Sequence, residues 1–511
     1  MKRLNSQVGQ TAIDTDMNGN KRFIIAAVCI CIAAVLYGIF HTSIPNWVVW
    51  ENKEIYDSSN TYEIRLSHKK VQVFSNINVS GQQMIWSSDE AIKVQNVLSC
   101  DIDGDHEDEL LLLCWKKGRY GKSRPFWVKS DEKNWSQHIF VYEFPRHSTT
   151  EEETLQITPK WMSSYIGQDV VTISFHTLNH ANPAKARLLL TDPDGIVSCW
   201  FWESWGFTKE DCDVSFTIFG DNLIHEPIYR YGLQHEESFD FLFAHVKEEI
   251  ANSDVSVMNQ ETPLVNIPSR YHDYPRFGTP LAVGKAIAQA GFDIVTCATN
   301  HALDQGSYGI NTTKDYFQQQ DILCLGIQSQ TESTYQPYEI LEKKGIRFAL
   351  LNYTYGTNGI PISADYPHMV HLLSDEQQIK TDLSLARKDA DFIIVFVHWG
   401  TEDMTEPDDF QKKWTQIFLD NKVDVVIGTH PHVLQPYEII TSEDGHQMLV
   451  YYSLGNFISA QPQKECIKGG MATFTVGLTT DGYRVLRYDL QPLTITWEED
   501  GCYSVYPATT P

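Results

Sequence analysis

Side chains that can bind metals or transfer protons follow five apolar, strand-like runs in the C-terminal half of the sequence. The runs are VSFTIF (214–219), VSVM (255–258), FDIVTCA (292–298), FIIVFV (392–397) and VDVVIG (423–428). The polar residues that follow them are Asp221, Glu261, Asn300, His301, His398, His430 and His432. Ligands bind beyond the carboxyl ends of strands in open α/β sheets, so we expect these residues around one crevice.

The residue types at these strand ends favour a divalent metal. Imidazole, carboxylate and amide donors suit Zn, Mn or Fe(II), and no thiolate follows the strands to favour a softer metal. Pro431 stiffens the turn between His430 and His432, which could aim one imidazole at each of two metals. Taken alone, a histidine after a strand is more often a cap or a surface residue, and Asn300 a turn residue. Their recurrence at one sheet edge favours a shared metal site.

The stretches that must position these residues alternate between strand and helix. Helical patterns at 238–251, 279–290, 307–319, 375–389 and 408–421 lie between the apolar runs. Such alternation is typical of an α/β sheet domain, predicted here over residues 213–511, and the strand-like tail 470–511 completes a sheet. Residues 61–210 instead alternate apolar and polar residues, as in Tyr62–Leu66, which predicts a mainly-β domain of short antiparallel strands.

The N-terminal region predicts a membrane anchor. Residues 23–40 form a run of eighteen residues without charge, which as a helix spans about 27 Å and suits a bilayer core. Lys and Arg precede the run, so residues 1–22 are expected in the cytoplasm and the bulk of the chain outside the cell, after a stalk at 41–60. A cleaved signal peptide is the alternative, but the apolar run is long and no small-x-small site follows it.

The net charge of −26 excludes nucleic acid as an expected partner, because phosphate backbones are held by Lys and Arg. An anionic polymer would need a local basic patch or bound cations. The chain has ten cysteines, and those behind the apolar run could include a disulfide such as Cys100–Cys114 or could be buried thiols.

A second group of carboxylates lies in the predicted β domain. Asp101, Asp103, Asp105 and Asp108 are spaced so that a turn could wrap Ca²⁺ in oxygen ligands. The run is not an EF-hand, because His106 takes the place of the required glycine. It resembles the Asp-x-Asp-Gly-Asp loops of FG-GAP or VCBS blades, and a solvated acidic turn is the alternative. Tryptophans of the same domain form either a glycan platform or its core.

The strand-end residues lie in stretches that together resemble the CapA family, which includes the poly-γ-glutamate capsule proteins CapA and PgsA. The resemblance covers about residues 213–460. It rests on FTIFGDNLIH, MNQETPL, IVTCATNHALDQGSYGI, VFVHWGTE, VVIGTHPHVLQP and YYSLGNFI.

The resemblance implies a relative of the calcineurin-type metallophosphoesterases, with a four-layer α-β-β-α domain of two packed sheets flanked by helices. It implies one or two divalent metals held by Asp221, Glu261, Asn300, His398, His430 and His432. His301 would protonate a leaving group. His225, Asn259 and Asn456 are expected to contact substrate or support the ligands, although His225 could instead cap a helix and Asn456 belong to a structural turn. Asp221 lacks the histidine two residues later that phosphoesterases carry, which leaves metal number and phosphoester specificity open.

Three functions remain in view. The first is an anchored, extracytoplasmic, metal-dependent hydrolase of capsule or surface-polymer assembly, acting on a phosphoester or on γ-linked polyglutamate. The second is a non-catalytic scaffold that binds the synthase and export proteins of such a polymer. The third is a protein that binds cell-wall glycan through its N-terminal β domain.

Overall fold

The computed structural model describes residues 43–76, 83–121, 124–145, 156–177, 186–332 and 334–508. The predicted cytoplasmic tail and membrane anchor, residues 1–22 and 23–40, lie outside these ranges. Within them, no helix has both the length and the apolar character needed to cross a membrane. The chain forms two compact units, Met1–Glu210 (unit 1) and Asp211–Pro511 (unit 2).

Unit 1 is built from antiparallel strands in its described part, arranged as three four-stranded sheets. The first sheet contains β1 (Lys53–Tyr56), β2 (Tyr62–Ser67), β3 (Lys70–Ser75) and β4 (Gln83–Ser87). The second contains β5 (Lys93–Cys100), β6 (Glu109–Lys117), β7 (Trp135–Glu143) and β8 (Thr158–Met162). The third contains β9 (Thr172–Thr177), β10 (Ala186–Thr191), β11 (Val197–Glu203) and β12 (Gly206–Glu210).

Two hydrophobic clusters hold the sheets of unit 1 together. Alternating residues of β6 divide between them: Leu110 and Leu112 pack towards the first sheet, and Leu111 and Leu113 towards the third. This follows from the period of two residues along a strand, which sends successive side chains to opposite faces. Because both faces of the middle sheet are covered, β6 reads as a continuous apolar run in the sequence.

One sheet of unit 2 has the order β18-β17-β14-β13-β26-β27-β28, with β25 also paired to β13. Its central strands β13, β14, β17 and β18 are parallel, and the C-terminal strands join antiparallel to β13. The bounds are β13 (Val214–Asn222), β14 (Val255–Gln260), β17 (Ile294–Thr296), β18 (Leu323–Leu325), β25 (Asn456–Ile458), β26 (Lys468–Thr479), β27 (Gly482–Trp497) and β28 (Tyr503–Pro507).

The other sheet of unit 2 has the order β19-β20-β21-β22-β24-β23, and a short parallel pair, β15 and β16, stands apart. In this sheet β20, β21, β22 and β24 are parallel. The bounds are β15 (Leu264–Val265), β16 (Thr279–Pro280), β19 (Glu339–Lys343), β20 (Ile346–Thr354), β21 (Phe392–His398), β22 (Val425–Thr429), β23 (Tyr437–Thr441) and β24 (Gln447–Tyr451).

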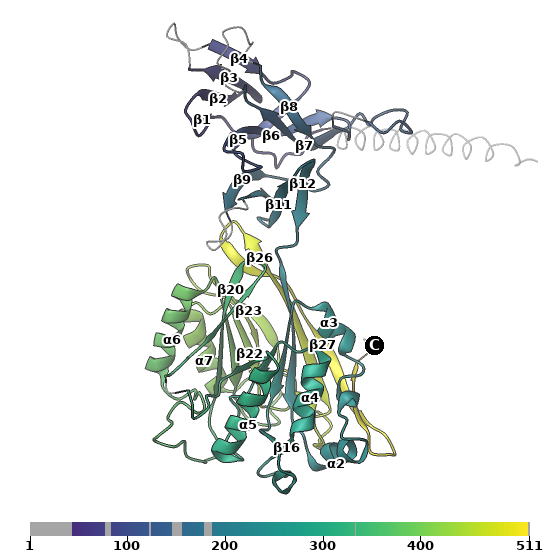
Figure 1. The fold of residues 1–511 in the computed structure, drawn as a ribbon, viewed down its shortest axis with the longest axis vertical. Helices are drawn as coiled ribbons and strands as arrows, with labels where there is room; N and C mark the ends of the chain where they lie inside the picture. The colour runs from purple at the N-terminus through teal and green to yellow at the C-terminus, as the bar shows by residue number, and fades with distance from the viewer. Residues whose placement is uncertain are drawn as a thin grey trace, which may run out of the picture. The chain divides into compact units, whose positions relative to one another are not determined.

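Helices cover the outer faces of both sheets (Figure 1). They are α2 (Glu226–Gln234), α3 (Lys247–Asn252), α4 (Leu281–Ala290), α5 (Gly306–Gln319), α6 (Glu376–Asp389) and α7 (Asp409–Asp420), with 3₁₀ turns at Asp240–Leu242 and Pro268–Arg270. On β21, Ile394 and Phe396 face the core between the sheets, whereas Ile393 and Val395 face α6 and α7. Helices α2 to α5 cover the other sheet. The α/β class predicted for this region is therefore confirmed, in four layers.

One predicted helix is wrong. Residues 238–251 form a 3₁₀ turn and the short helix α3 instead of one continuous helix. Phe239, Leu242, Phe243 and Val246 are all buried in the core of unit 2, so packing of these large side chains overrides the helical pattern.

Candidate metal centre

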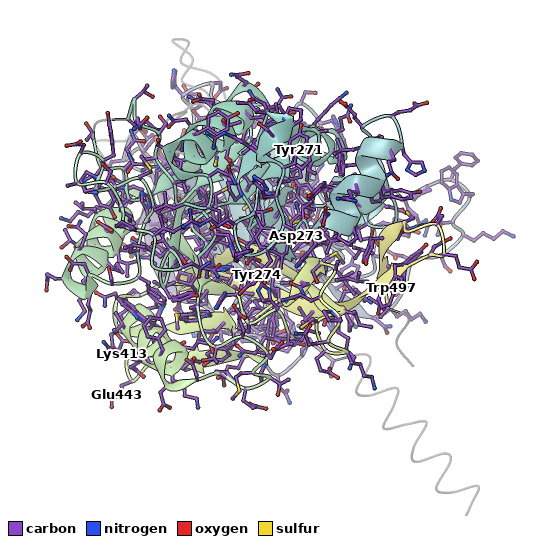
Figure 2. The ribbon with its side chains drawn as sticks, turned by 90° about the horizontal axis from the view of Figure 1, so that it is seen from below. Tyr271, Asp273, Tyr274, Lys413, Glu443 and Trp497 are labelled. Atoms are coloured by element: carbon purple, nitrogen blue, oxygen red, sulfur yellow. The ribbon has the colours of Figure 1, made fainter. Side chains whose placement is uncertain are left out.

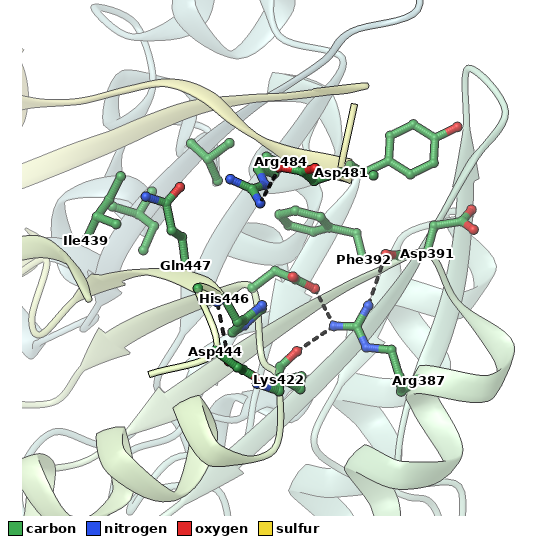
Figure 3. Close-up of a pocket in the computed structure, with 16 residues that line it drawn as sticks. Arg387, Asp391, Phe392, Lys422, Ile439, Asp444, His446, Gln447, Asp481 and Arg484 are labelled. Carbon is green, nitrogen blue, oxygen red and sulfur yellow. Dashed lines mark hydrogen bonds and ion pairs between the residues drawn. The ribbon is translucent and has the colours of Figure 1, made fainter. Parts of the chain in front are cut away.

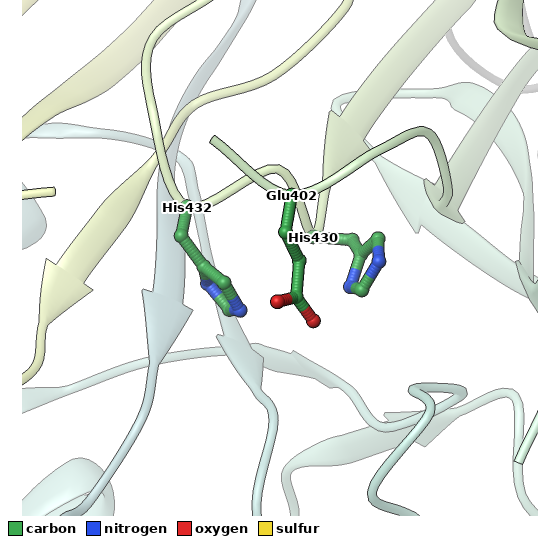
Figure 4. Close-up of side chains that lie close together, drawn as sticks. All are labelled: Glu402, His430 and His432. Atoms are coloured by element: carbon green, nitrogen blue, oxygen red, sulfur yellow. The ribbon is translucent and has the colours of Figure 1, made fainter. Parts of the chain in front are cut away.

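The parallel strands of both sheets of unit 2 end at one edge, where the loops that follow them bring the predicted residues together. Ligand atoms of Asp221, Glu261 and His432 lie within 4.8 Å of one another, and so do those of Glu402, His430 and His432. Figure 4 shows Glu402 between the two histidines. All of these side chains are buried except Glu402. The two groups share His432, which makes it the centre of the cluster.

Asp221 is fully buried and accepts several hydrogen bonds. Its Oδ1 accepts from Asn259 Nδ2 at 2.7 Å, and its Oδ2 from the backbone N–H of His430 at 3.2 Å and from His432 Nδ1 at 3.1 Å. Asn456 Oδ1 also accepts from His432 Nδ1, at 3.0 Å. These bonds leave His432 Nε2 to face Glu261 Oε1, 3.7 Å away. Asp221 therefore orients His432, as a carboxylate behind a ligating histidine does.

Glu261 is the buried carboxylate without a partner. Neither of its oxygens accepts a hydrogen bond, although the side chain is fully buried. Burial raises the pKa of Glu261 well above its usual range, with the charge of Asp221 adding to the rise and that of His432 opposing it. A buried carboxylate with two unpaired oxygens costs several kcal/mol unless a cation binds it, so Glu261 fits a metal ligand.

The pKa of His432 is also raised. Desolvation opposes its charge, but Glu261 and Asp221 outweigh that effect and raise the pKa of His432 to about 10. Glu261 therefore faces a protonated His432, with His432 Nε2 and Glu261 Oε1 3.7 Å apart. A divalent cation bound at this place would displace the proton, because metal ligands must be deprotonated.

His430 supplies a further unpaired donor atom. Its Nδ1 is buried and has no hydrogen-bond partner. Burial lowers the pKa of His430 well below its usual range, and the nearby His432 lowers it further, so the ring stays neutral as metal ligation requires. The backbone of His430 and His432 has φ of 98° and 60°, which is unfavourable for residues other than glycine. Strain of this kind is typical of a loop that holds ligands in place.

His398 and Asn300 lie beside the cluster but bind each other. His398 Nε2 contacts Asn300 Oδ1 at 2.9 Å, and its Nδ1 contacts Thr429 Oγ1 at 2.9 Å. His398 Nε2 also lies 3.7 Å from Glu261 Oε1. Burial, followed by repulsion from His430, lowers the pKa of His398 well below its usual range. Of the six predicted ligands, the structure thus gathers Asp221, Glu261, His430 and His432 into groups and gives the other two protein partners.

His301 forms a dyad with Asp304. His301 Nδ1 donates to Asp304 Oδ2 at 2.7 Å, and the backbone N–H of Phe277 donates to the same oxygen at 2.8 Å. The Phe277 ring stands edge-on to His301, with centroids 4.8 Å apart. These contacts fix the imidazole and leave Nε2 as the atom for proton transfer.

The loop that follows β15 carries Phe277 to this dyad. Figure 2 looks at this edge of unit 2, with Tyr271, Asp273 and Tyr274 of the same loop facing the viewer. Tyr274 is exposed, whereas Phe277 is buried. The loop therefore joins the surface of the unit to the buried dyad.

His225 lies near the same loop. Its ring stands edge-on to Phe277 with centroids 5.3 Å apart, and its Nδ1 accepts from the backbone N–H of Ala460 at 3.2 Å. His225 occupies the N-cap position of α2, but its side chain makes no capping hydrogen bond. Helix capping by this side chain, one of the two alternatives, is therefore not what the structure shows.

Sequence reasoning missed Glu402 and Asp304. Glu402 lies four residues after His398, in the stretch His398-Trp-Gly-Thr-Glu402, and Gly400 with φ of 91° turns the chain between them. Asp304 lies three residues after His301. The close spacing of an acidic residue after each histidine was the available signal. The strand-end pattern reaches only the first polar residues after each apolar run, so it did not include these two.

The predicted calcium ligands of unit 1 do not all meet. Asp108 accepts from Ser99 Oγ and the backbone N–H of Ser58, both at 2.9 Å, and lies outside the group that Asp101 and Asp103 form. Glu109, the next residue, points the other way and groups with Asp101 and Asp103, because successive side chains along a strand alternate. Lys160 binds Asp103 at 2.7 Å and also Glu109, so an ammonium already lies in this group. Asp105 belongs to the same surface loop as Asp101 and Asp103.

The proposed Cys100–Cys114 disulfide is also wrong. Cys100 pairs in register with Glu109 of β6, and Cys114 lies five residues farther along that strand. At about 3.3 Å per residue the two Cα atoms are far beyond the reach of a disulfide.

A hollow at the amino ends of the strands is distinct from the cluster (Figure 3). Its cations are already paired: Arg387 with Asp424 at 2.6 Å, Lys422 with Asp444, and Arg484 with Asp481 at 3.0 Å. These pairs tie neighbouring loops together, and we assign no chemistry to the hollow.

Residues 215–461 match the family model "Bacterial capsule synthesis protein PGA_cap". Two curated relatives match about the same part of the chain. They are the capsule biosynthesis protein CapA of Bacillus anthracis, 27% identical over 264 residues, and the PGA biosynthesis protein CapA of Bacillus subtilis, 26% identical over 258 residues. Unit 2 belongs to the CapA family. Each match covers 50% of this chain, and it spans 61% and 65% of the length of the two relatives.

Solved structures resemble this CapA-family unit only weakly. The calcineurin-like phosphoesterase YfkN from Bacillus subtilis is 15% identical, with 55% of this chain and 90% of that chain covered and a TM-score of 0.34. The NAD nucleotidase NadN from Haemophilus influenzae is 11% identical, with 58% and 54% covered and a TM-score of 0.34. The sheets and helices of unit 2 themselves define its fold.

Proposed function

We propose that unit 2 is a metal-dependent hydrolase that acts on a capsule or cell-surface polymer. The observation that carries the proposal is Glu261, whose two buried oxygens accept no hydrogen bond and whose Oε1 faces His432, the residue that also groups with His430 and Glu402. Glu402 adds a carboxylate that is open to solvent. These nitrogen and oxygen donors suit Zn, Mn or Fe(II).

When bound, such a metal would lower the pKa of a water ligand and polarise the scissile group of a substrate. The side chains of the protein would orient the metal ligands and deliver a proton. Asp221 and Asn456 hold His432 in one orientation, and Asn259 holds Asp221. His301, fixed by Asp304, would deliver a proton from Nε2 to the leaving group, which is the usual work of a positioned histidine.

The substrate follows from the family and the charge of the chain. CapA relatives are named for capsule and PGA biosynthesis, so we propose a phosphoester or a γ-linked glutamate polymer as the substrate class. The net charge of −26 repels a polyanion in general, so bound cations would have to attract it locally.

The proposed cellular setting comes from the sequence. We propose that residues 23–40 anchor the chain in the cell membrane with residues 41–511 outside, next to the proteins that synthesise and export the polymer. The run of eighteen uncharged residues and the basic residues before it support this arrangement.

Turnover by the detergent-solubilised chain tests the proposal. The chain is loaded with Zn, Mn or Fe(II) and assayed on an aryl phosphodiester and on poly-γ-glutamate. The variant His301→Ala and the control His235→Ala are assayed in the same way. His235 is an exposed histidine at the C-cap of α2. We expect His301→Ala to lower kcat by about 10²–10⁴-fold with metal content unchanged, and His235→Ala to behave as wild type. Absence of turnover in the metal-loaded wild type would favour the non-catalytic scaffold.

A further inference from the structure

A cleft in unit 1 lies outside the chemistry proposed for unit 2. Its volume is about 1080 Å³, which is at the upper end of small-molecule sites. One side comes from the loop 101–106 and the start of the neighbouring strand β8, and the other from β10 and the β11–β12 hairpin. The side chains that line the cleft include Asp101, Asp103, Lys160, Arg187, Trp202 and Trp205.

The aromatic part of the cleft is held rigidly. Trp161, Trp202 and Phe207 pack edge-on against one another, with ring centroids between 5.1 and 6.0 Å apart. Gly206 lets the hairpin approach Trp161, because a Cβ at this position would lie 2.7 Å from the indole nitrogen. Aromatic surface fixed in this way loses little entropy when it binds a ligand.

Trp205 is the exposed member of the aromatic group. It stands in the turn between β11 and β12 and is 70% exposed. A single exposed tryptophan is ordinary on a protein surface. This one borders a cleft whose wall is already formed by ordered rings, which makes it available as a stacking platform.

The polar part of the cleft is ordered, and its acidic side chains outnumber its cations. Lys160 binds Asp103 at 2.7 Å and Glu109, and Arg187 binds Glu210 through Nη2 at 2.9 Å. Asp101 accepts from the backbone N–H groups of Gly104 and His106, at 2.7 and 2.9 Å, which fixes the loop. These ordered side chains offer directional donors and acceptors, which suit a ligand rich in hydroxyl groups.

We infer that this cleft binds a saccharide. The apolar face of a sugar ring stacks on the indole of Trp205, and its hydroxyl groups exchange hydrogen bonds with Asp103, Lys160 and Arg187. Tryptophan suits this use because its large ring has an apolar face. The site would let unit 1 hold a surface glycan, whether or not unit 2 turns over a polymer.

Titration calorimetry on the detergent-solubilised chain tests the assignment with chitotetraose, cellotetraose and maltotetraose as probes. We expect at least one of them to bind wild type, and Trp205→Ala to weaken that binding by about tenfold or more. Trp205→Phe keeps an aromatic ring and should lose less. Trp127→Ala is the matched control, because Trp127 is also 70% exposed in unit 1 but does not line the cleft.

Three results would overturn the inference. The first is that none of the three saccharides binds wild type at millimolar concentration. The second is that Trp205→Ala and Trp127→Ala weaken binding equally. The third is that choline, an organic cation that aromatic rings also bind, binds at this site while the saccharides do not.

Discussion

The carboxylates of unit 2 and those of the acidic loop in unit 1 differ in what surrounds them. In unit 2, both oxygens of Glu261 are buried and unpaired, and the facing groups are histidines. In unit 1, Asp103 and Glu109 already bind Lys160, and Asp101 accepts from backbone N–H groups. Closely spaced acidic residues therefore predict a cation in both places, but the protein supplies its own cation in unit 1. Unsatisfied atoms, more than the number of carboxylates, mark the metal centre.

The largest effect on this comparison is expected from Asp304→Asn. The amide keeps the shape of Asp304 but no longer holds a charge against His301 Nδ1, 2.7 Å away. We expect kcat to fall about 100-fold and metal content to stay unchanged, as measured by steady-state kinetics and elemental analysis of the same sample. Loss of metal in Asp304→Asn would place the dyad in the metal site instead.

Asp221→Asn tests whether this residue works through His432. Asparagine can still accept a hydrogen bond from Nδ1 but lacks the charge that orients and polarises the ring. Substitution behind a ligating histidine typically costs 10–100-fold in metal affinity, so we expect a loss of about that size in a metal titration. An unchanged affinity would show that Asp221 has only a packing role.

Lys160→Met tests the other side of the comparison. Burial raises the pKa of Glu109, and Lys160 opposes this rise, so removal of the ammonium leaves a buried carboxylate with the backbone N–H of Ile102 but no cation. We expect unit 1 to lose about 3 kcal/mol of stability in urea unfolding. Added Ca²⁺ should restore part of this loss in the variant and have little effect on wild type. The same calcium response in wild type and variant would contradict the role given to Lys160.

His371 gives the smallest expected effect and a pH dependence. Burial lowers the pKa of His371 to about 3, and its ring has no carboxylate partner among its hydrogen bonds, unlike that of His432. Below about pH 6.5 His371 is protonated in the unfolded chain but stays neutral in the folded chain. The folded state therefore loses stability as the pH falls from about 6.5 towards 3.

At pH 5 the loss attributable to His371 should be about 2 kcal/mol. Urea unfolding of unit 2 at pH 7 and pH 5 measures it. His371→Gln should lack this part of the pH dependence, and equal slopes in both proteins would show that His371 does not cause it.

Much of unit 2 could be predicted from its sequence because local signals and packing agree there. Helices α4 to α7 lie within about two residues of the predicted stretches, and α7 begins at a capping box formed by Asp408 and Gln411. Helix α2 was not predicted, since Pro227 and Gly232 interrupt its short pattern, yet Ile228 and Tyr229 are buried in the core. The helix predicted over residues 238–251 was wrong for the opposite reason. Its sequence pattern is regular, but burial of its large side chains interrupts the helix.

The strand-end rule named residues that the structure gathers into a candidate centre, but it could not assign their contacts. It named Asp221, His398 and His432 alike, because all follow a strand. Only the structure shows that His398 Nε2 contacts Asn300, whereas His432 Nδ1 contacts Asp221. The rule could not reach Glu402, which arrives from a loop. It included Asp108 because spacing along the chain does not tell which way a side chain points just before β6.

Metal content of the purified chain tests the account most directly. Elemental analysis and calorimetric titration with Zn²⁺ and Mn²⁺ would compare wild type with Glu261→Gln and with the control Glu339→Gln. Glu339 is a half-buried glutamate of β19, far from Glu261 in the sequence. We predict that wild type and Glu339→Gln bind a divalent metal in unit 2 and that Glu261→Gln weakens this binding by about 100-fold or more. Equal metal content and affinity in Glu261→Gln and wild type would contradict the assignment of the centre.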